Sequence, residues 1–228
     1  MPVIVFASPK GGVGKSTSAL LLAHELAHEG ATVSLIDADP NEVIVKWSKA
    51  GDYPDNITVH GNITEDTILD VIDEERQTKN FVIVDLEGSK NLKISRSIGR
   101  AELVIIPLRP SQIDVTMAAE AIKLVRTEGQ YFGRTIPHRL LFTMTSAAIM
   151  TRDHKAAIAD LGGAGVPIFE TTLNERAAFR ALFAYGGTVR DLPEKEVRNI
   201  EAAADNATAF FEEVVNVLKA NRGKGDAA

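Results

Sequence analysis

The residues with the clearest capacity for chemistry lie near the N-terminus, in the segment Ser8-Pro-Lys-Gly-Gly-Val-Gly-Lys-Ser-Thr17. Its glycines permit backbone angles that are closed to other residues, so backbone N–H groups can approach an anion closely. A short apolar run precedes the segment and a helical pattern follows it, and the N-terminal end of a helix attracts negative charge. The segment therefore predicts a loop that cradles phosphate groups.

The side chains of this loop have distinct expected roles. Lys15 is expected to neutralise the β- and γ-phosphates of ATP, and the Ser16 hydroxyl is expected to ligate Mg²⁺. The common pattern G-x-x-x-x-G-K-[ST] is not met, because Pro9 occupies its first glycine position and a second lysine, Lys10, precedes the glycine pair. The predicted nucleotide-binding residues are Lys10, Gly11, Gly12, Val13, Gly14, Lys15, Ser16 and Thr17.

Carboxylates stand at two further points where strands are expected to end. Asp37 and Asp39 close one apolar run, and Asp85 follows the run Phe81-Val-Ile-Val. Ligands of parallel α/β sheets bind at the carboxyl ends of the strands, so these aspartates are expected to face the phosphate loop. An aspartate there can orient an attacking water or hold a Mg²⁺-bound water, although Asp37 and Asp39 could instead form a turn and a helix cap. Glu87 is a weaker candidate for a catalytic carboxylate, since it lies two residues beyond Asp85 rather than next to it.

These motifs together resemble those of a known family. Lys10 to Thr17 resembles the deviant Walker A motif of the ParA/MinD ATPases, and Asp37-Ala-Asp39-Pro is similar to the switch motif of that family. The segment 104–114 resembles the loop after the fifth strand in the short ParA partition ATPases that lack an N-terminal DNA-reading domain. The resemblance covers nearly the whole chain, and its specific motifs lie in the first 115 residues.

The resemblance implies roles for the same side chains. Lys10 would cross a nucleotide-sandwich dimer to the phosphates of the partner, acting on developing charge as an arginine finger does. Asp39 would position the attacking water, Asp37 would support the metal shell, and Asp85 would hold Mg²⁺ through water. The predicted catalytic residues are therefore Lys10, Lys15 and Asp39, and the predicted metal-binding residues are Ser16, Asp37 and Asp85.

The resemblance also implies a cycle. The expected protein is a weak ATPase that forms a homodimer on binding ATP and Mg²⁺, binds DNA without sequence preference, and is reset when a ParB-like adaptor stimulates hydrolysis. It would segregate or position a plasmid, a chromosome or another cargo, and it would be cytoplasmic and nucleoid-associated in its ATP state. Two alternatives remain: a MinD-like positioning ATPase at a membrane surface, and a dethiobiotin-synthetase-like metabolic enzyme.

Binding to DNA requires clustered Lys and Arg side chains that release counterions. The net charge of −6 excludes a protein that is coated in basic charge, so a local patch is expected. The main candidates are Arg176, Arg180, Arg190, Lys195 and Arg198, followed by Arg222 and Lys224 in the tail. A second set is Lys90, Lys93, Arg96 and Arg100.

The scaffold that must position these residues follows from the alternation of β-branched runs with helical patterns. This alternation predicts an α/β P-loop NTPase fold, with a twisted, mostly parallel sheet of about seven strands and helices on both faces. We expect one domain over residues 1–221 and a basic flexible tail over 222–228. The predicted strands cover 3–7, 32–36, 57–60, 81–84, 102–107, 139–144 and 166–169, and the predicted helices cover 15–28, 41–50, 65–79, 113–128, 151–161, 175–185 and 194–220.

Composition supports this assignment by exclusion. The chain has 228 residues and no cysteine, which excludes disulfides, thiolate metal sites and the cluster ligands of nitrogenase iron-protein relatives. Apolar stretches fall short of the roughly 18–20 residues that a membrane span needs, so no span is expected. The terminal helical pattern carries glutamates on its polar face, which indicates packing against the core rather than against a membrane.

Overall fold

Strands and helices alternate along the chain, as the sequence predicts. The computed structural model describes residues 1–88 and 92–225. The strands in this part are β1 (Val3–Phe6), β2 (Val33–Ala38), β3 (Ile57–His60), β4 (Phe81–Leu86), β5 (Leu103–Leu108), β6 (His138–Thr145) and β7 (Leu173–Asn174). The helices are α1 (Lys15–His28), α2 (Val43–Ser48), α3 (Ile68–Thr78), α4 (Leu92–Arg100), α5 (Gln112–Tyr131), α6 (Arg152–Gly163), α7 (Ala177–Tyr185) and α8 (Ile200–Gly225), with a 3-10 turn, η1, over Val189–Asp191.

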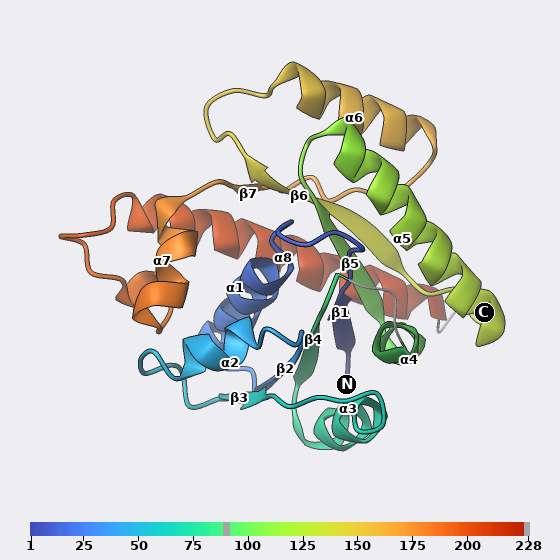
Figure 1. The fold of residues 1–228 in the computed structure, drawn as a ribbon, viewed down its shortest axis with the longest axis horizontal. Coiled ribbons are helices and arrows are strands. Elements are labelled where there is room, and N and C mark those ends of the chain that lie inside the picture. Colours follow the sequence, from blue (N-terminus) through green and yellow to red (C-terminus); the bar gives the residue numbers. More distant parts are fainter. Residues whose placement is uncertain (89–91, 226–228) are drawn as a thin grey trace.

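One parallel sheet forms the centre of the molecule. Its strand order is β3-β2-β4-β1-β5-β6-β7, and every neighbouring pair is parallel (Figure 1). β1 therefore lies between β4 and β5, and the loop that leaves β1 faces the ends of both. The predicted fold class, a parallel α/β sheet flanked by helices on both faces, is confirmed.

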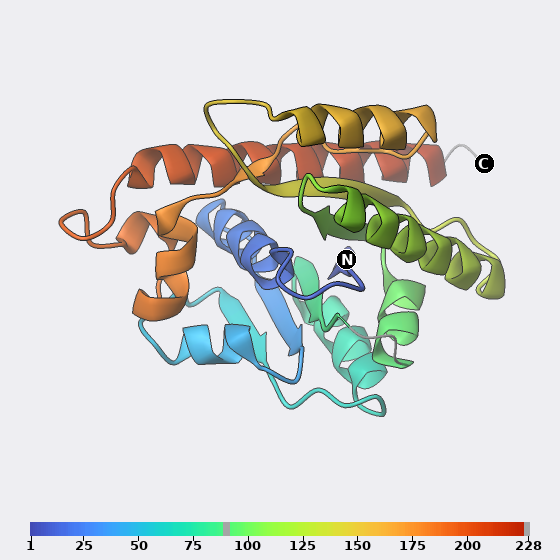
Figure 2. The same ribbon diagram turned by 45° about the horizontal axis from the view of Figure 1, so that its top comes forward.

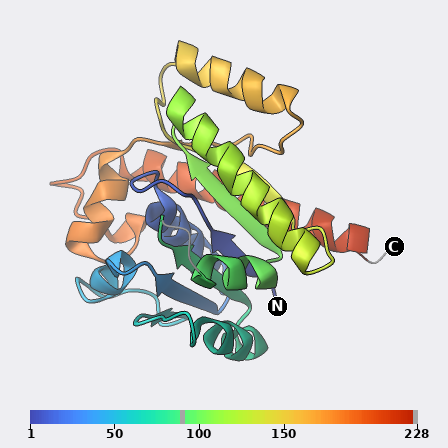
Figure 3. The same cartoon turned by 45° about the vertical axis from the view of Figure 1, so that its right-hand side comes forward.

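The two faces of the sheet bury separate apolar clusters. β1 shows the division, because Ile4 and Phe6 enter one cluster while Val3 and Val5 enter the other. The first face is covered by α1, α2, α7 and α8, and the second by α3, α4, α5 and α6 (Figures 1 and 2). Figure 3 shows α4 and α5 on one side and α1 and α7 on the other. Strands covered on both sides need continuous apolar runs, which explains why the central strands carry few polar residues.

Three elements differ from the prediction. The last strand is β7 rather than residues 166–169, where only Ile168 makes an isolated bridge. The sequence does not predict α4, because Ile94 and Ile98 are its only buried apolar residues and they make too short a stripe to recognise. The terminal helix begins at Ile200 rather than at residue 194, since Asn199 has a φ of 58° and interrupts it.

Helix α8 packs along the sheet and not away from it. Phe210, Val214 and Leu218 are buried in the same cluster as the apolar face of α1. The helix continues through Gly225, into the segment predicted as a tail, and residues 226–228 lie outside the described part. No described helix is long and apolar enough to cross a membrane. The apolar face of α8 is therefore occupied by the protein core.

Candidate nucleotide-binding site

The phosphate loop joins β1 to α1 and is shaped by its glycines. Gly12 and Gly14 have φ angles of 70° and 87°, in the left-handed region that favours glycine. A side chain on Gly14 would also approach Thr143, whose Cβ lies 3.5 Å from the position of an added Cβ. The loop is thus held between the start of α1 and the end of β6.

Donors from outside the loop bind its carbonyl oxygens. The Arg109 guanidinium donates to the carbonyl of Gly12 at 2.5 Å, and the Thr143 hydroxyl donates to that of Val13 at 2.7 Å. The Ser18 hydroxyl donates to the carbonyl of Gly14 at 2.7 Å. Because the C=O and the following N–H of a trans peptide point in opposite directions, fixing these oxygens outward aims the next N–H groups into the loop. The loop is prepared for an anion before any ligand arrives.

Lys15 lies within this cradle and is nearly buried, at 6% exposure. Its Nζ donates to the carbonyl of Lys10 at 3.3 Å. Burial lowers the pKa of Lys15, and the carboxylates of Asp85, Asp39 and Glu87 oppose that shift. A buried ammonium surrounded by carboxylates and backbone donors is well placed to bind a polyphosphate.

Asp85 is the carboxylate with unused bonding capacity. It is fully buried, and neither of its carboxylate oxygens has a hydrogen-bond partner of normal geometry among the described residues. Burial raises the pKa of Asp85 to about 7, against the opposing effect of the Ser16 hydroxyl and, more weakly, of Lys15. Asp85 pairs in register with Phe6 on β1 and with Asp37 on β2, so it sits beneath the phosphate loop. A buried carboxylate without partners, close to a hydroxyl, suits a divalent cation.

Asp37 is already satisfied by backbone donors. Its Oδ2 accepts from the N–H groups of Ile44 at 2.8 Å and Val45 at 3.0 Å, and its Oδ1 accepts from that of Asp39 at 3.3 Å. Burial raises the pKa of Asp37, and these N–H groups oppose the rise. The side chain therefore caps the start of α2, which is the alternative that the sequence left open for it.

Asp39 stands at the rim of the phosphate cavity in a tight turn. Its Oδ1 accepts from both the backbone N–H and the side-chain Nδ2 of Asn41, at 2.8 Å and 2.9 Å. The cavity has a volume of about 440 Å³, and Lys15, Ser16 and Glu87 also line it. Lys15, Ser16 and Asp39 thus line one space, whereas the other two predicted metal-binding residues, Asp37 and Asp85, are not part of its lining.

Lys10 does not point into that cavity. Its Nζ lies 2.8 Å from Oδ1 of Asp114, at the start of α5, and its side chain is 36% exposed. Asp114 is buried and also bonds to Ser111, the residue that caps this helix. Lys10 is therefore held at the surface by an ion pair within the chain, whereas Lys15 lies inside the loop.

A second cavity of about 420 Å³ continues from the phosphate cavity past Gly14 and Thr17. It is mostly apolar, and Phe179 and Phe183 form part of its lining. Met144 borders both cavities with a φ of 52°, at the irregularity where β6 shifts register against β7. This shape and polarity suit a nucleoside whose phosphates occupy the loop.

Sequence reasoning found part of this second cavity. Thr143, Thr172 and Asn174 follow late apolar runs of the sequence, at predicted strand ends where the base is expected to sit. Thr143 and Asn174 line the cavity, whereas Thr172 bonds to Thr145 and Asn174. Arg109 and Phe183 were missed, because each lies in a segment with no phosphate-binding motif of its own. Only the fold brings them to the loop.

The five main candidates for DNA binding differ in their contacts within the protein. Arg176 and Arg180 line the second cavity, and Arg176 bonds to Asn174 and Asn206. Arg190 makes two hydrogen bonds to the buried carboxylate of Glu25, at 2.5 Å and 2.9 Å, and a third to Thr208.

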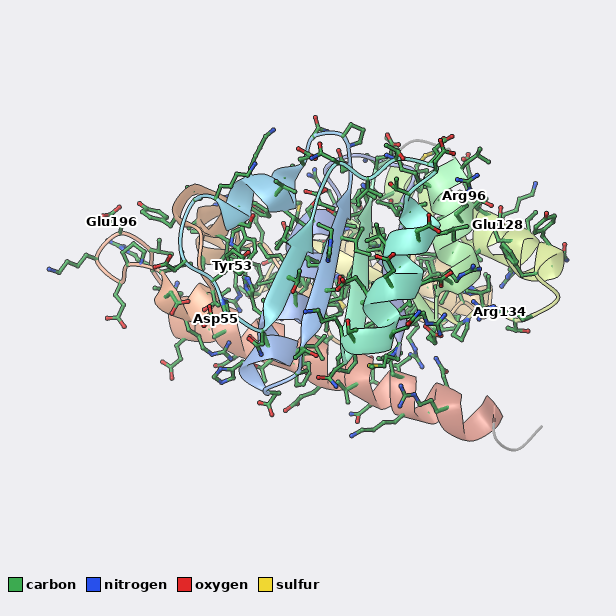
Figure 4. All side chains as sticks on the ribbon, turned by 90° about the horizontal axis from the view of Figure 1, so that it is seen from below. Tyr53, Asp55, Arg96, Glu128, Arg134 and Glu196 are labelled. Carbon is green, nitrogen blue, oxygen red and sulfur yellow. The ribbon has the colours of Figure 1, made fainter. Side chains whose placement is uncertain are left out.

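Lys195 and Arg198 differ from these three arginines. Both are exposed, in the loop that carries Glu196. Figure 4 shows this loop projecting at one end of the molecule, far from Glu128 and Arg134. Arg180 and Arg190 are exposed as well, but Lys195 and Arg198 make no hydrogen bond or ion pair among the described residues.

The second basic set is largely engaged in contacts within the protein. Lys93 is buried, donates to the carbonyl of Ala38 at 2.9 Å and lies 3.6 Å from Glu87. Arg100 binds Asp73 at 3.0 Å, and Arg96 bonds to the backbone of Glu65. Lys90 lies outside the described residues, as do the side chains of the tail beyond Gly223.

Solved structures confirm the fold. An ATP complex of McdA from Cyanothece superposes with a TM-score of 0.74 at 17% identity, over 94% of this chain and 96% of that one. MinD from Pyrococcus horikoshii, complexed with Mg-ADP, superposes with a TM-score of 0.69 at 16% identity, over 96% and 98% of the two chains. At these identities the similarity concerns the fold.

A deviant phosphate loop on the central strand of this sheet, with carboxylates at the ends of β2 and β4, defines a P-loop ATPase of the ParA/MinD type. A protein named ParA, from Rhizobium radiobacter, is 43% identical over 210 residues, which cover 92% of this chain and 94% of that protein. The family model described as VirC1 protein matches residues 1–219, and the chain belongs to this family.

Proposed function

We propose that this protein is an ATPase that forms a nucleotide-sandwich homodimer, binds DNA without sequence preference in its ATP state, and is released by hydrolysis that a ParB-like adaptor stimulates. Repeated cycles would segregate or position plasmid or chromosomal DNA or another cargo. In the cell the protein would be cytoplasmic and nucleoid-associated while it holds ATP.

The observation that carries the proposal is that the two lysines of one loop lie in different places, one buried and one partly exposed. Lys15 is buried in the cradle, where it can meet the β- and γ-phosphates of the nucleotide of its own subunit. Lys10 is partly exposed and bound to Asp114, with its charge directed away from that nucleotide. A second cation is useful for phosphoryl transfer when it comes from outside the subunit, as an arginine finger does.

Within one subunit, the residues divide the remaining work. The backbone N–H groups of residues 11–17 bind the phosphates, and Asp39 orients the attacking water. Ser16 and Asp85 would hold Mg²⁺, which neutralises charge on the phosphate oxygens when bound. Asp37 shapes the loop that carries Asp39, through its bonds to the start of α2. Phe179 and Phe183 accommodate the base.

The relatives support the nucleotide and the partition role in different ways. The McdA structure holds ATP and the MinD structure holds Mg-ADP, in the same fold. The name of the Rhizobium ParA relative is that of the partition ATPases. The buried apolar face of α8 gives no support to a membrane-surface role.

The test is retention of the purified protein on random-sequence duplex DNA with ATP, with ADP and without nucleotide. We expect retention with ATP only, and its loss in Lys15→Ala and at raised salt, because phosphate contacts release counterions. The double variant Lys195→Ala/Arg198→Ala should lower the slope of log affinity against log salt by about 2, at roughly 0.9 per phosphate contact. Arg126→Ala/Lys123→Ala, which removes two exposed charges of α5, is the matched control.

Other outcomes would overturn parts of the proposal. Retention that is independent of nucleotide would contradict the ATP-gated step. ATP binding without retention in any state would remove the DNA step. Light scattering of the protein with a non-hydrolysable ATP analogue tests the dimer, and a wild-type protein that stays monomeric would contradict the sandwich. In a separate binding measurement, Lys10→Ala should still bind nucleotide.

A further inference from the structure

The turn that carries Asp39 contains a side chain with no assigned role. Asn41 follows Asp39 by two residues, is exposed, and lines the phosphate cavity. Both its backbone N–H and its Nδ2 donate to the same atom, Oδ1 of Asp39, at 2.8 Å and 2.9 Å. A short polar side chain that bonds across its own turn in this way fixes the direction of its partner.

The two oxygens of Asp39 are thereby made unequal. Oδ1 accepts two hydrogen bonds from Asn41, whereas no donor among the described residues bonds to Oδ2. An ionised carboxylate is an acceptor only, with bonding capacity on both oxygens. With one oxygen occupied and the side chain immobilised, the other oxygen is left to accept a hydrogen bond from a water in the cavity.

The rest of the turn holds Asn41 in place. The Lys46 ammonium donates to the carbonyl of Asn41 at 2.7 Å, from the following helix. The N–H of Glu42 donates to the carbonyl of Asp39 at 2.9 Å, and Glu42 has a φ of 47° in the left-handed region. A non-glycine residue persists in that region only when the surrounding structure over-determines it. The turn is therefore fixed from both sides, before nucleotide binds.

We propose that Asn41 is a positioning residue for hydrolysis: it holds the Asp39 carboxylate in the one orientation that directs Oδ2 at the attacking water. Asn41 acts through Asp39 and needs no contact with the nucleotide. The proposal rests on the role given to Asp39 in the proposed function, and its test separates the two.

The test compares hydrolysis with binding in four single variants and one double variant. Asn41→Leu keeps the shape of the side chain and removes its donor, while the backbone N–H of residue 41 still reaches Asp39. We expect kcat to fall about 10-fold, by analogy with the roughly 10- to 100-fold losses that follow removal of a hydrogen-bond partner of a metal-ligating side chain. The dissociation constant for ATP should stay within about twofold, and the thermal midpoint should not change. Lys46→Met, which frees the carbonyl of Asn41, should lower kcat by a smaller factor.

Lys49→Met is the matched control for Lys46→Met. Lys49 is exposed at the end of the same helix and its ammonium makes no hydrogen bond or ion pair among the described residues, so kcat should equal that of the wild type.

Asp39→Ala supplies the reference and a double-mutant cycle. If Asn41 acts only through Asp39, then Asn41→Leu has no further effect on kcat in the Asp39→Ala background, because the two losses are not additive. Equal losses in both backgrounds would overturn the proposal, as would an unchanged kcat in Asn41→Leu when Asp39→Ala abolishes hydrolysis. Unchanged hydrolysis in Asp39→Ala would instead remove the role of Asp39 itself.

Discussion

The two halves of the nucleotide site are built in different ways. The phosphate half comes mainly from two short contiguous segments, the loop 10–17 and the turn 37–46, to which β4 adds Asp85. From farther along the chain, Arg109 and Thr143 bind the carbonyl oxygens of the loop. The base half is assembled from residues far apart in the chain, among them Arg109, Met144 and Phe183. Chemistry that depends on backbone N–H groups can be encoded locally, whereas an apolar cavity needs the whole fold.

The same contrast holds for their charges. The phosphate half contains buried ionisable groups with displaced pKa values, Lys15, Asp37 and Asp85. The base half presents arginines at its surface that already bond to neighbouring polar groups. We therefore expect substitutions in the first half to affect every phosphate ligand, and substitutions in the second half to affect only ligands that carry a base.

The largest effect is expected from Lys15→Ala. Loss of the buried ammonium should weaken the binding of both ATP and tripolyphosphate by about 1000-fold, in the upper range for one preorganised electrostatic contact. Isothermal titration with the two ligands measures this. Lys155→Ala, at an exposed position of α6, is the control. If tripolyphosphate still bound with wild-type affinity, the phosphate half would not depend on Lys15.

Arg190→Ala tests whether α1 is held in place from the far end of the chain. It leaves the Glu25 carboxylate, which is 3% exposed, without its charged partner. The free energy of unfolding should fall by about 3 kcal/mol, the lower end for breaking a buried pair. Urea denaturation provides the measurement, with the exposed Arg152→Ala as the reference variant. A loss of DNA retention without any loss of stability would show that Arg190 contacts DNA instead.

His24 provides a test of the burial of α1 through pH. Burial lowers the pKa of His24 to about 3, and neither ring nitrogen has a hydrogen-bond partner in the part of the chain that the structure describes. Below pH 6.5 His24 becomes protonated in the unfolded chain but stays neutral in the folded protein. The free energy of unfolding therefore falls as the pH decreases toward 3.

The size of this effect follows from linkage. Between pH 6.5 and 4.5 the loss from His24 should be about 2 kcal/mol, at roughly 1.4 kcal/mol per pH unit. The ring centroids of His24 and Trp47 lie 5.1 Å apart, so His24→Phe keeps an aromatic ring against Trp47. The substitution should remove the part of the pH dependence that comes from His24. Urea denaturation of both proteins at several pH values is the measurement. Parallel curves would show that His24 does not resist protonation.

The smallest effect belongs to the base half. Phe183→Ala should weaken ATP binding about 10-fold, or roughly 1.4 kcal/mol, within the range for a base–aromatic contact. Tripolyphosphate binding should not change, in contrast to Lys15→Ala. Phe211→Ala, which truncates another partly buried phenylalanine of the same cluster, controls for loss of packing. Equal weakening of both ligands would break the division between the two halves.

Sequence reasoning reached the phosphate half and most of the sheet for a physical reason. Phosphate binding requires glycines, a lysine and a helix start in fixed order, and buried parallel strands require apolar runs. Both patterns can be recognised from residues that are neighbours in the sequence. For Asp37 the sequence offers the helix cap only as one of two alternatives, and the bond to Ile44 in the fold selects it. The pairing of Lys10 with Asp114 could not be derived, because only the fold brings the two side chains together. Strand β7 was missed because it is two residues long.

The bond between Glu25 and the last part of the chain has a consequence for synthesis. During synthesis the phosphate loop is made before the segments that hold α1, because Arg190 and Thr208 bond to Glu25 and α8 packs in the same cluster. Contacts between segments far apart in a chain cannot form until both have been made. A nascent chain therefore carries the complete phosphate-binding sequence before it carries the residues that hold α1 in place.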